Sequence, residues 1–373
     1  MDRRRFVLAC GAGLLAGRSE AAVLSDDSIH DILYRRIDVE KRATGMAVAV
    51  ADQGRERIVV HGVQDAPGSP PVAASTLFEI GSVTKVFTAL LLADMAHRGE
   101  LGFDDPVDRY LPDGLRTPQR NGRAITLAQL AIHTSGLPYF PFSPITTPNP
   151  LEALAHFSLA DLRDWLAGLT LPRDPGSQWE YSNAGYGILG LALASRAGTS
   201  FDALLEKRIA APLGLRDTTL HPSGDATKRL AKGHDAKLEA VPPIELGIFA
   251  PAGALRSTAT DLLAFLRALL PDSGSPLAAS ARLLPTIRTA VPTLGGEQAM
   301  GWEIASQGGP FLVKDGVTSG QTASVVLDVP NRTGIAVLSN AFPSNLQLPP
   351  GGGIGAADLS RHLIRPELPL GRP

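Results

Sequence analysis

The spacing of apolar residues changes along the chain, from strand-like near both ends to helical in the middle. The segments 46–50 and 57–60 flank a turn-forming sequence and predict a β-hairpin. Close to the C-terminus, 323–329 and 333–339 predict two further strands joined by a short turn. Both ends of the chain therefore supply strands to a sheet.

Helices are predicted where apolar residues recur every three or four positions. The first follows Ser25, Asp26 and Asp27, which have the side chains favoured at a helix N-cap. A second N-cap is predicted at Thr126. The predicted helical segments are 26–37, 82–95, 125–132, 159–169, 185–197, 201–209, 262–270, 281–288 and 356–364.

This order of elements predicts an α+β fold with two lobes. An antiparallel sheet, flanked by the terminal helices, is expected from residues 22–75 and 297–373. A mainly helical lobe, residues 76–296, is expected to be inserted into it. A functional site is then expected in the cleft between the lobes.

The first 21 residues have the pattern of an export signal. Arg3 and Arg4 precede a short apolar run, 6–16, and small residues at Ser19 and Ala21 mark a cleavage site. The paired arginines favour a twin-arginine signal, with a Sec signal as the alternative. The apolar run is too short to span a membrane. The mature protein is therefore expected in the periplasm or outside the cell.

Composition removes several classes of function. The chain has 373 residues, a formal net charge of −2, 44% hydrophobic and 19% charged residues. These values are typical of a globular protein, and they argue against a nucleic-acid binder. Cys10 is the only cysteine and lies in the export segment, so thiol catalysis and disulfides are not expected in the mature protein.

No metal ion or cofactor is expected. The chain has no phosphate-binding loop, dinucleotide fingerprint or Gly-x-Ser-x-Gly elbow. Its histidines lack metal-ligand spacing, and their interpretation as surface or capping residues is favoured. This interpretation applies to His61, His133, His221 and His234.

Ser82 and Lys85 form the central chemical motif. They stand three residues apart before an apolar run, so a helix that begins near Ser82 places both on one face. A serine at a helix N-terminus lies where free backbone N–H groups and the helix dipole favour developing negative charge. A nearby amine could accept its proton, so Ser82 is a candidate nucleophile. Alone, the motif is also common in ordinary helix caps.

Two further motifs follow in order, Tyr181-Ser182-Asn183 and Lys314-Asp315-Gly316. With the Ser82 motif, they resemble the penicillin-recognising serine hydrolases, above all the class C β-lactamases and related low-molecular-weight penicillin-binding proteins. The resemblance covers nearly the whole mature chain. It implies the same two-lobed fold, with the site in the cleft.

The resemblance also implies a role for each motif residue. Lys85 and Tyr181 would move protons, and nearby lysine cations would favour the Tyr181 phenolate or strengthen the residue as a relay. Asn183 would hold Lys85 and the substrate amide, and the Lys314 ammonium would meet a substrate carboxylate. A substrate would lie along the strand edge at Gly316, with the backbone N–H groups of Ser82 and Val317 forming an oxyanion hole.

One departure from the family pattern affects substrate choice. Asp315 stands where a threonine is usual, and its carboxylate would repel a substrate carboxylate if it faced the cleft. We expect an acyl-enzyme hydrolase acting on β-lactams or D-alanyl-D-alanine peptides. The alternatives are an esterase of the same fold and a non-catalytic protein that binds cell-wall peptides. The presence of Ser82, Lys85 and Tyr181 argues against the last.

The export interpretation predicts that replacing Arg3 and Arg4 by lysine blocks export, because a twin-arginine signal depends on both side chains. The measurement is the distribution of the protein between cell fractions, with the N-terminus of the mature form sequenced. We expect that N-terminus near Ala22. Unchanged export of the double variant would instead assign the signal to the Sec route.

Overall fold

We describe the protein from a computed structural model. The described residues are 23–112, 114–142, 150–291, 296–342 and 355–371. The predicted export segment, residues 1–21, lies outside them.

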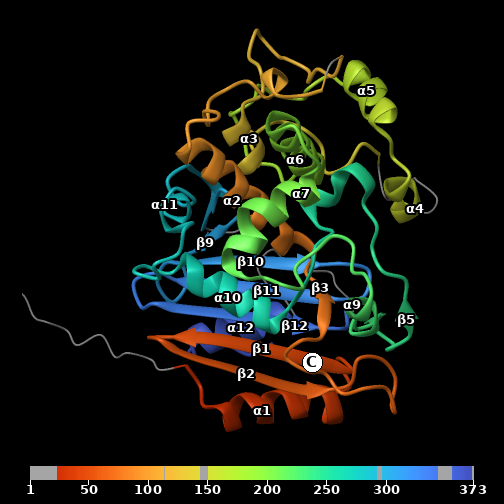
Figure 1. Ribbon diagram of the computed structural model, residues 1–373, viewed down its shortest axis with the longest axis vertical. Helices are drawn as coiled ribbons and strands as arrows, with labels where there is room; N and C mark the ends of the chain where they lie inside the picture. The colour runs from red at the N-terminus through yellow and green to blue at the C-terminus, as the bar shows by residue number, and fades with distance from the viewer. Residues whose placement is uncertain (1–22, 113, 143–149, 292–295, 343–354, 372–373) are drawn as a thin grey trace, which may run out of the picture.

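An eight-stranded antiparallel sheet forms the centre of the molecule, in the order β2-β1-β12-β11-β10-β9-β8-β7 (Figure 1). Its strands are β1 (Gly45–Asp52), β2 (Arg55–Gly62), β7 (Arg288–Val291), β8 (Gly296–Ala299), β9 (Glu303–Ala305), β10 (Phe311–Val317), β11 (Thr322–Asp328) and β12 (Thr333–Ser339). The N-terminal hairpin pairs directly with β12, with Met46 opposite Ser339. The predicted α+β fold is confirmed.

Two small antiparallel pairs accompany the sheet: β3 (Leu77–Glu79) with β6 (Arg256–Thr258), and β4 (Gly233–His234) with β5 (Ala240–Val241). The first pair leads the chain into the Ser82 turn.

The α-helices lie mostly between β3 and β7 in sequence. They are α1 (Asp26–Tyr34), α2 (Thr84–His97), α3 (Leu127–Ala131), α4 (Pro150–Ala155), α5 (Leu159–Gly168), α6 (Asn183–Ala197), α7 (Phe201–Leu205), α8 (Ala211–Leu213), α9 (Asp225–Lys228), α10 (Ala259–Leu269), α11 (Ala278–Ala281) and α12 (Ala356–Ile364). Short 3-10 or π-helical segments are Arg35–Val39, Gly81–Val83, Val107–Arg109, Glu206–Ala210 and Gly247–Ala252.

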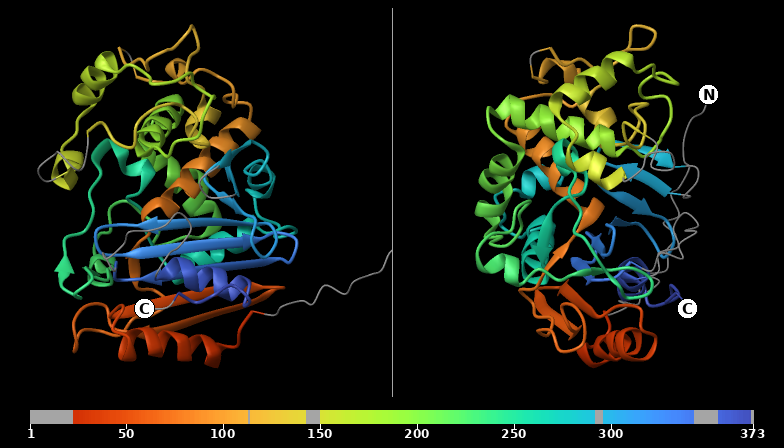
Figure 2. Two further views of the ribbon diagram at one scale, coloured as in Figure 1. Left: turned by 180° about the vertical axis from the view of Figure 1, so that it is seen from behind. Right: turned by 90° about the vertical axis from the view of Figure 1, so that its right-hand side faces the viewer.

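The two faces of the sheet belong to different cores. On one face, Val48 and Val337 pack with Leu33 of α1 and Leu359 of α12. On the other, alternate strand residues such as Ala49 pack with α10, α2 and the rest of the helical lobe. Figures 1 and 2 show α10 and α12 on opposite sides of the sheet. Because side chains alternate along a strand, each central strand serves both cores.

Helix starts follow the predicted capping residues. Ser25 accepts a hydrogen bond from the backbone N–H of Ser28 at the start of α1. Thr126 forms a reciprocal capping box with Gln129 before α3. Such side chains satisfy donors that a helix N-terminus leaves free, so they fix where the helix begins.

Two expectations need correction. A helix was expected over 281–288, but α11 ends at Ala281 and β7 begins at Arg288. Pro285 lies between them and cannot donate the backbone hydrogen bond that a continuing helix needs. Helix α2 was expected to bury one face, but every residue from Thr84 to Met95 is buried, because sheet and helical lobe enclose it.

The division of the chain into lobes at 22–75, 76–296 and 297–373 stays a proposal. Strand β7 precedes the last of these boundaries, although it belongs to the sheet.

Within the described ranges, no single helix is long and apolar enough to cross a membrane. Only when α6 is taken together with Phe201–Leu213, across a sharp bend, do the described helices reach the length and apolar composition of a membrane span.

Candidate active site

The turn that carries Ser82 is held tightly against β10. It is a 3-10 turn, Gly81–Val83, that runs directly into α2. Gly81 has a φ of +50°, and a Cβ there would lie 2.5 Å from the backbone nitrogen of Val317. Only glycine suits both the left-handed backbone and this close approach. The turn therefore brings Ser82 to the C-terminal end of β10, beyond the residues that pair with β9.

Lys85 lies one helical turn beyond Ser82 and is completely buried. Its Nζ is 3.1 Å from Ser82 Oγ, 2.7 Å from Asn183 Oδ1 and 2.6 Å from the carbonyl oxygen of Ala252. Burial, with a smaller contribution from the Lys314 charge, lowers the pKa of Lys85 well below its ordinary value. The amine is therefore far easier to deprotonate than a surface lysine.

Tyr181 completes the contacts of Ser82. Its hydroxyl donates to Ser82 Oγ at 2.8 Å. The Nζ atoms of Lys85 and Lys314 lie 4.8 and 4.9 Å from the centre of its ring. Burial raises the Tyr181 pKa, and the opposing effect of Lys314 does not overcome it. Desolvation thus favours the neutral phenol over the phenolate, although the neighbouring cation opposes it.

Lys314, on β10, is the second buried lysine of the site and has the opposite pKa shift. It is 2% exposed and donates to Glu303 Oε1 at 3.0 Å. Burial alone would lower its pKa, but the Glu303 carboxylate, through its charge and its hydrogen bond, raises it. The site thus holds one lysine that readily loses its proton and one that keeps it. Sequence reasoning missed Glu303, which no motif marks.

Asn183 reaches the site from the first turn of α6. Ser182, not Asn183, is the N-cap, because its Oγ accepts from the backbone N–H of Gly185 at 2.8 Å. This leaves the Asn183 amide free to accept from Lys85. The alternative interpretation of Asn183 as a simple N-cap is wrong for that reason.

Gly316 permits a second close approach between β10 and the Ser82 turn. A Cβ on Gly316 would lie 1.9 Å from the carbonyl oxygen of Ile80 and 3.1 Å from the backbone nitrogen of Ser82. A side chain at this position would therefore separate the two backbones. Val317 follows with its side chain 42% exposed. The backbone nitrogens of Ser82 and Val317 both lie at this junction.

Asp315 does not face the cleft. Its carboxylate accepts from Arg361 at 2.7 and 3.1 Å and from Ser324 Oγ at 2.7 Å. Arg361 belongs to α12, on the sheet face opposite Lys314. The expectation that Asp315 meets a substrate carboxylate is therefore wrong, because adjacent strand residues point to opposite faces.

His133 is a second residue that sequence reasoning missed. It is 1% exposed, and its ring centroid lies 4.3 Å from that of Tyr181. Its Nδ1 accepts from the backbone N–H of Ser182 at 3.1 Å. Burial first, and then the charges of Lys314 and Lys85, lower its pKa well below the ordinary value. A neutral imidazole therefore supports the Tyr181 ring.

The other histidines stand apart from the site. His234 is also buried at 1% exposure, so the surface interpretation is wrong for it as for His133. The side chain of His61 is 23% exposed and pairs with Asp38. In the described part of the chain, no group of three or more histidine, cysteine or acidic residues could hold a metal ion.

A cavity of about 310 Å³ opens beside Ser82. Its wall is largely apolar and includes the rings of Tyr139, Phe140 and Phe142. Asn183 and Val317 also line it. Neither Lys85 nor Lys314 lines the cavity, and both are buried. The cleft therefore offers an apolar surface next to a serine that has two proton-handling neighbours.

Comparison with known proteins gives a consistent result. A family model described as Beta-lactamase matches residues 29–350. A beta-lactamase of Providencia stuartii is 32% identical over 247 residues, which are 66% of this chain and 60% of the relative. The D-alanyl-D-alanine-carboxypeptidase/endopeptidase AmpH of Escherichia coli (strain K12) is 33% identical over 233 residues, 59% of this chain and 57% of that protein. The chain thus matches about three fifths of the length of these relatives.

Similarity also extends to solved structures. The crystal structure of a class C beta lactamase from Rhodobacter sphaeroides superimposes with a TM-score of 0.71 and 25% sequence identity. The superposition covers 84% of this chain and 95% of that one. The similarity includes both the sheet and the inserted helices, because so little of either chain is left out.

The contacts of Asp315 predict a structural effect for Asp315→Asn. The variant leaves the partly buried Arg361 guanidinium without its charge partner, so we expect the free energy of unfolding to fall by about 1–3 kcal/mol. Arg361 and Ser324 hold the Asp315 pKa below its ordinary value, even though burial opposes them. A carboxylate whose pKa is lowered by folding stabilises the fold at pH values above its unfolded pKa, which is about 4. That stability is lost as the pH falls through the folded pKa.

Urea unfolding of wild type and variant, at pH 7 and at about pH 3, measures this difference. We expect the gap to be largest at pH 7 and to shrink in acid. A variant of unchanged stability with faster acylation by carboxylate substrates would place the Asp315 side chain in the cleft after all.

Proposed function

This chain belongs to the Beta-lactamase family, and from that premise we propose that it is a serine hydrolase that forms an acyl-enzyme on Ser82. The observation that carries the proposal is the position of Ser82 Oγ, 3.1 Å from Lys85 Nζ and 2.8 Å from the Tyr181 hydroxyl. A serine hydroxyl needs a neighbouring base to become a nucleophile, and here a buried amine and a phenol both contact it.

The hydrogen bonds of Lys85 support its role as the base. The lowered pKa makes the neutral amine accessible, and in that state it has two protons and one lone pair. Asn183 Oδ1 and the Ala252 carbonyl oxygen can only accept, so they take the two protons. The lone pair is left for the Ser82 hydroxyl. With Lys85 charged, its Nζ donates to Ser82 Oγ; with Lys85 neutral, Ser82 Oγ would accept from Tyr181 and donate to Lys85, which orients the serine proton toward the base.

The reaction then proceeds in two halves. Ser82 Oγ attacks the substrate carbonyl carbon as its proton passes to Lys85, and the backbone N–H groups of Ser82 and Val317 stabilise the oxyanion. Tyr181 gives its proton to the leaving group and recovers one through Lys85. Water then attacks the acyl-enzyme as its proton passes to Tyr181, which hands its own proton on to Lys85 in the same step. The tetrahedral intermediate then releases the acid, and Ser82 Oγ takes the proton back from Lys85.

The proposed substrates are β-lactams and D-alanyl-D-alanine peptides. A relative is named as a beta-lactamase and another as a D-alanyl-D-alanine-carboxypeptidase/endopeptidase. Both substrate types contain an amide carbonyl for Ser82 and a carboxylate. The Lys314 ammonium, which keeps its charge beside Tyr181, would attract that carboxylate.

An ester substrate is the second candidate, and one observation favours it. The lining of the cleft, over the residues that the structure describes, contains no lysine or arginine. The charge of Lys314 is also balanced by Glu303 at 3.0 Å. A neutral acyl ester would lose nothing from this balance, whereas a carboxylate substrate has to compete with Glu303.

Export completes the proposal. Residues 1–21 act as a twin-arginine signal that takes the chain to the periplasm or beyond. Cell-wall peptides and incoming β-lactams both occur there, so the location suits either substrate.

Intact-protein mass spectrometry tests the function with a fluorescent penicillin, a D-alanyl-D-alanine peptide and a nitrophenyl ester. We expect an adduct of the acyl mass on wild type with at least one of them, or turnover where deacylation is fast. Ser82→Ala should form no adduct and lose turnover, because the nucleophile is gone while the helix remains. Ser177→Ala, an exposed serine outside the cleft, is the matched control. Wild-type turnover by Ser82→Ala would refute the assignment.

The shared contacts of Lys85 and Tyr181 predict non-additive kinetics. Each of Lys85→Ala and Tyr181→Phe should lower kcat about 100-fold or more, the usual scale for a proton-transfer group. Their double variant should lose less than the product of the two effects, because both act on the Ser82 proton. Steady-state rates on the best substrate of the adduct experiment give the comparison. Full additivity would mean that the two residues belong to separate proton networks.

A further inference from the structure

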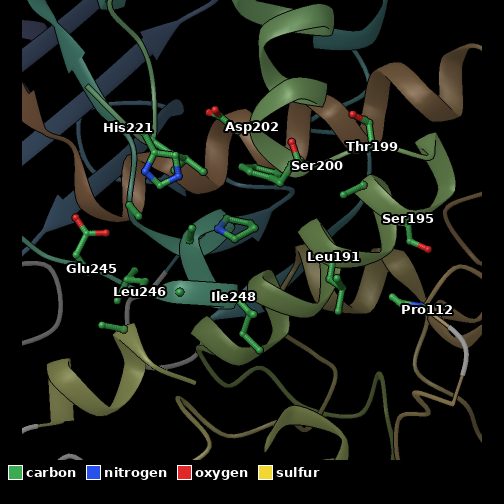
Figure 3. Close-up of a pocket in the computed structure, with 18 of the residues that line it drawn as sticks. Pro112, Leu191, Ser195, Thr199, Ser200, Asp202, His221, Glu245, Leu246 and Ile248 are labelled. Carbon is green, nitrogen blue, oxygen red and sulfur yellow. The ribbon is translucent and has the colours of Figure 1, made fainter. Parts of the chain in front are cut away.

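A second cavity, of about 810 Å³, lies behind the catalytic cleft. It is bounded by the C-terminal half of α6, the start of α7 and the 3-10 segment Gly247–Ala252 (Figure 3). The apolar part of its wall includes Leu191, Phe201, Leu246, Ile248 and Pro251. The volume is in the range of cavities that bind small organic molecules.

The shape of this cavity is fixed by tight packing of its walls. A Cβ on Gly190 of α6 would lie 2.2 Å from Pro251 Cγ, and one on Gly187 would lie 2.5 Å from a ring carbon of Phe249. Two glycines thus allow the 3-10 segment to rest directly on α6. Close packing of this kind leaves little room for the walls to collapse inward, so the cavity is preformed.

The cavity is distinct from the cleft that holds Ser82. Leu246 borders both spaces, but Ser82, Asn183 and Ala252 line only the cleft. The 3-10 segment is the partition: Pro251 lines the second cavity, and the next residue accepts a hydrogen bond from Lys85. A molecule in the second cavity would therefore occupy a site of its own.

Charges at the cavity are predominantly negative. Asp202 and Glu245 both line it, and Figure 3 shows them in the same ring of side chains as Leu191 and Ile248. In the described residues, Asp202 has no ion-pair partner. Two basic side chains line the cavity among the described residues, His221 and Arg256. Arg256 is buried and already contacts the carboxylates of Glu79 and Glu245. Arg256 is thus already balanced by its own carboxylate partners, and the Asp202 carboxylate remains as a negative charge without an ion-pair partner among the described residues of the cavity wall.

We propose that this cavity binds a small molecule that joins an apolar body to an ammonium group. The apolar wall would remove the body from water. The uncompensated carboxylate would favour a cation at the rim and disfavour an acid. This proposal does not depend on the acylation of Ser82.

Three probes with the same eight-carbon chain test the head group: octylammonium, octanol and octanoate, each below the concentration at which it forms micelles. Titration calorimetry with the Ser82→Ala protein measures binding without chemistry in the cleft. We expect octylammonium to bind several-fold more tightly than octanol and octanoate to bind most weakly. Equal affinity of the three probes, or tighter binding of octanoate, would overturn the charge argument.

Two variants locate the site. Leu191→Trp fills the cavity and should weaken octylammonium binding at least tenfold. Asp202→Asn should weaken octylammonium about threefold, the scale of a solvent-exposed ion pair, and leave octanol unchanged. Asp225→Asn, which removes an exposed carboxylate on α9, is the charge-matched control and should change neither. If Leu191→Trp fails to fold, the loss of octylammonium affinity in Asp202→Asn still locates the site.

The cleft is the competing location for these probes. Wild-type protein acylated on Ser82 should bind octylammonium as the free protein does. Loss of binding on acylation, or full binding by both folded cavity variants, would assign the probe to the cleft or to another surface and refute the proposal.

Discussion

The burial of Lys85 is the constraint on which the rest of the structure depends. An ammonium group taken out of water costs several kcal/mol unless it is paired, and no carboxylate contacts this one among the described residues. Besides Ser82 Oγ, the amine has two neutral acceptors, Asn183 Oδ1 and the Ala252 carbonyl oxygen. These come from α6 and from the 3-10 segment beside it. The environment of Lys85 therefore exists only where α6 and the 3-10 segment pack against α2.

Strand β10 separates two charges that are adjacent in sequence. Lys314 faces the helical lobe and pairs with Glu303, while Asp315 faces α12 and pairs with Arg361. The pleat of the strand thus prevents Asp315 from neutralising Lys314 directly. One pair maintains a cation near Tyr181, and the other attaches the C-terminal helix to the sheet. A single strand in this way joins the chemistry of the cleft to the stability of the outer layer.

The sequence was informative where interactions are local. The Ser82–Lys85 spacing, the N-caps at Ser25 and Thr126, and the first hairpin all depend on residues a few positions apart. It failed for the face of Asp315, because both faces of β10 are buried and the apolar run Phe311–Val313 shows no alternation.

Glu303 and His133 were missed for a related reason: each acts through space on a residue far away in sequence. Glu303 contacts Lys314 only because β9 pairs with β10. His133 follows the end of α3 with a φ of +60° and packs on Tyr181, 48 positions later. The only feature of the sequence that marks His133 is its place in a turn between an apolar helix and Thr-Ser-Gly. That feature does not distinguish a buried imidazole ring from an exposed one.

These electrostatics shift substrate recognition toward the acyl group. At 4 Å and an effective dielectric near 20, a charge pair is worth about 4 kcal/mol, so Glu303 already satisfies much of the Lys314 charge. A substrate carboxylate would therefore gain only the part of the attraction to Lys314 that Glu303 leaves unsatisfied. The rings of Tyr139, Phe140 and Phe142, in contrast, have no such partner to displace before an apolar group packs against them. In the proposed reaction, the aromatic wall would therefore contribute more to selecting the acyl group than Lys314 contributes to selecting the acid.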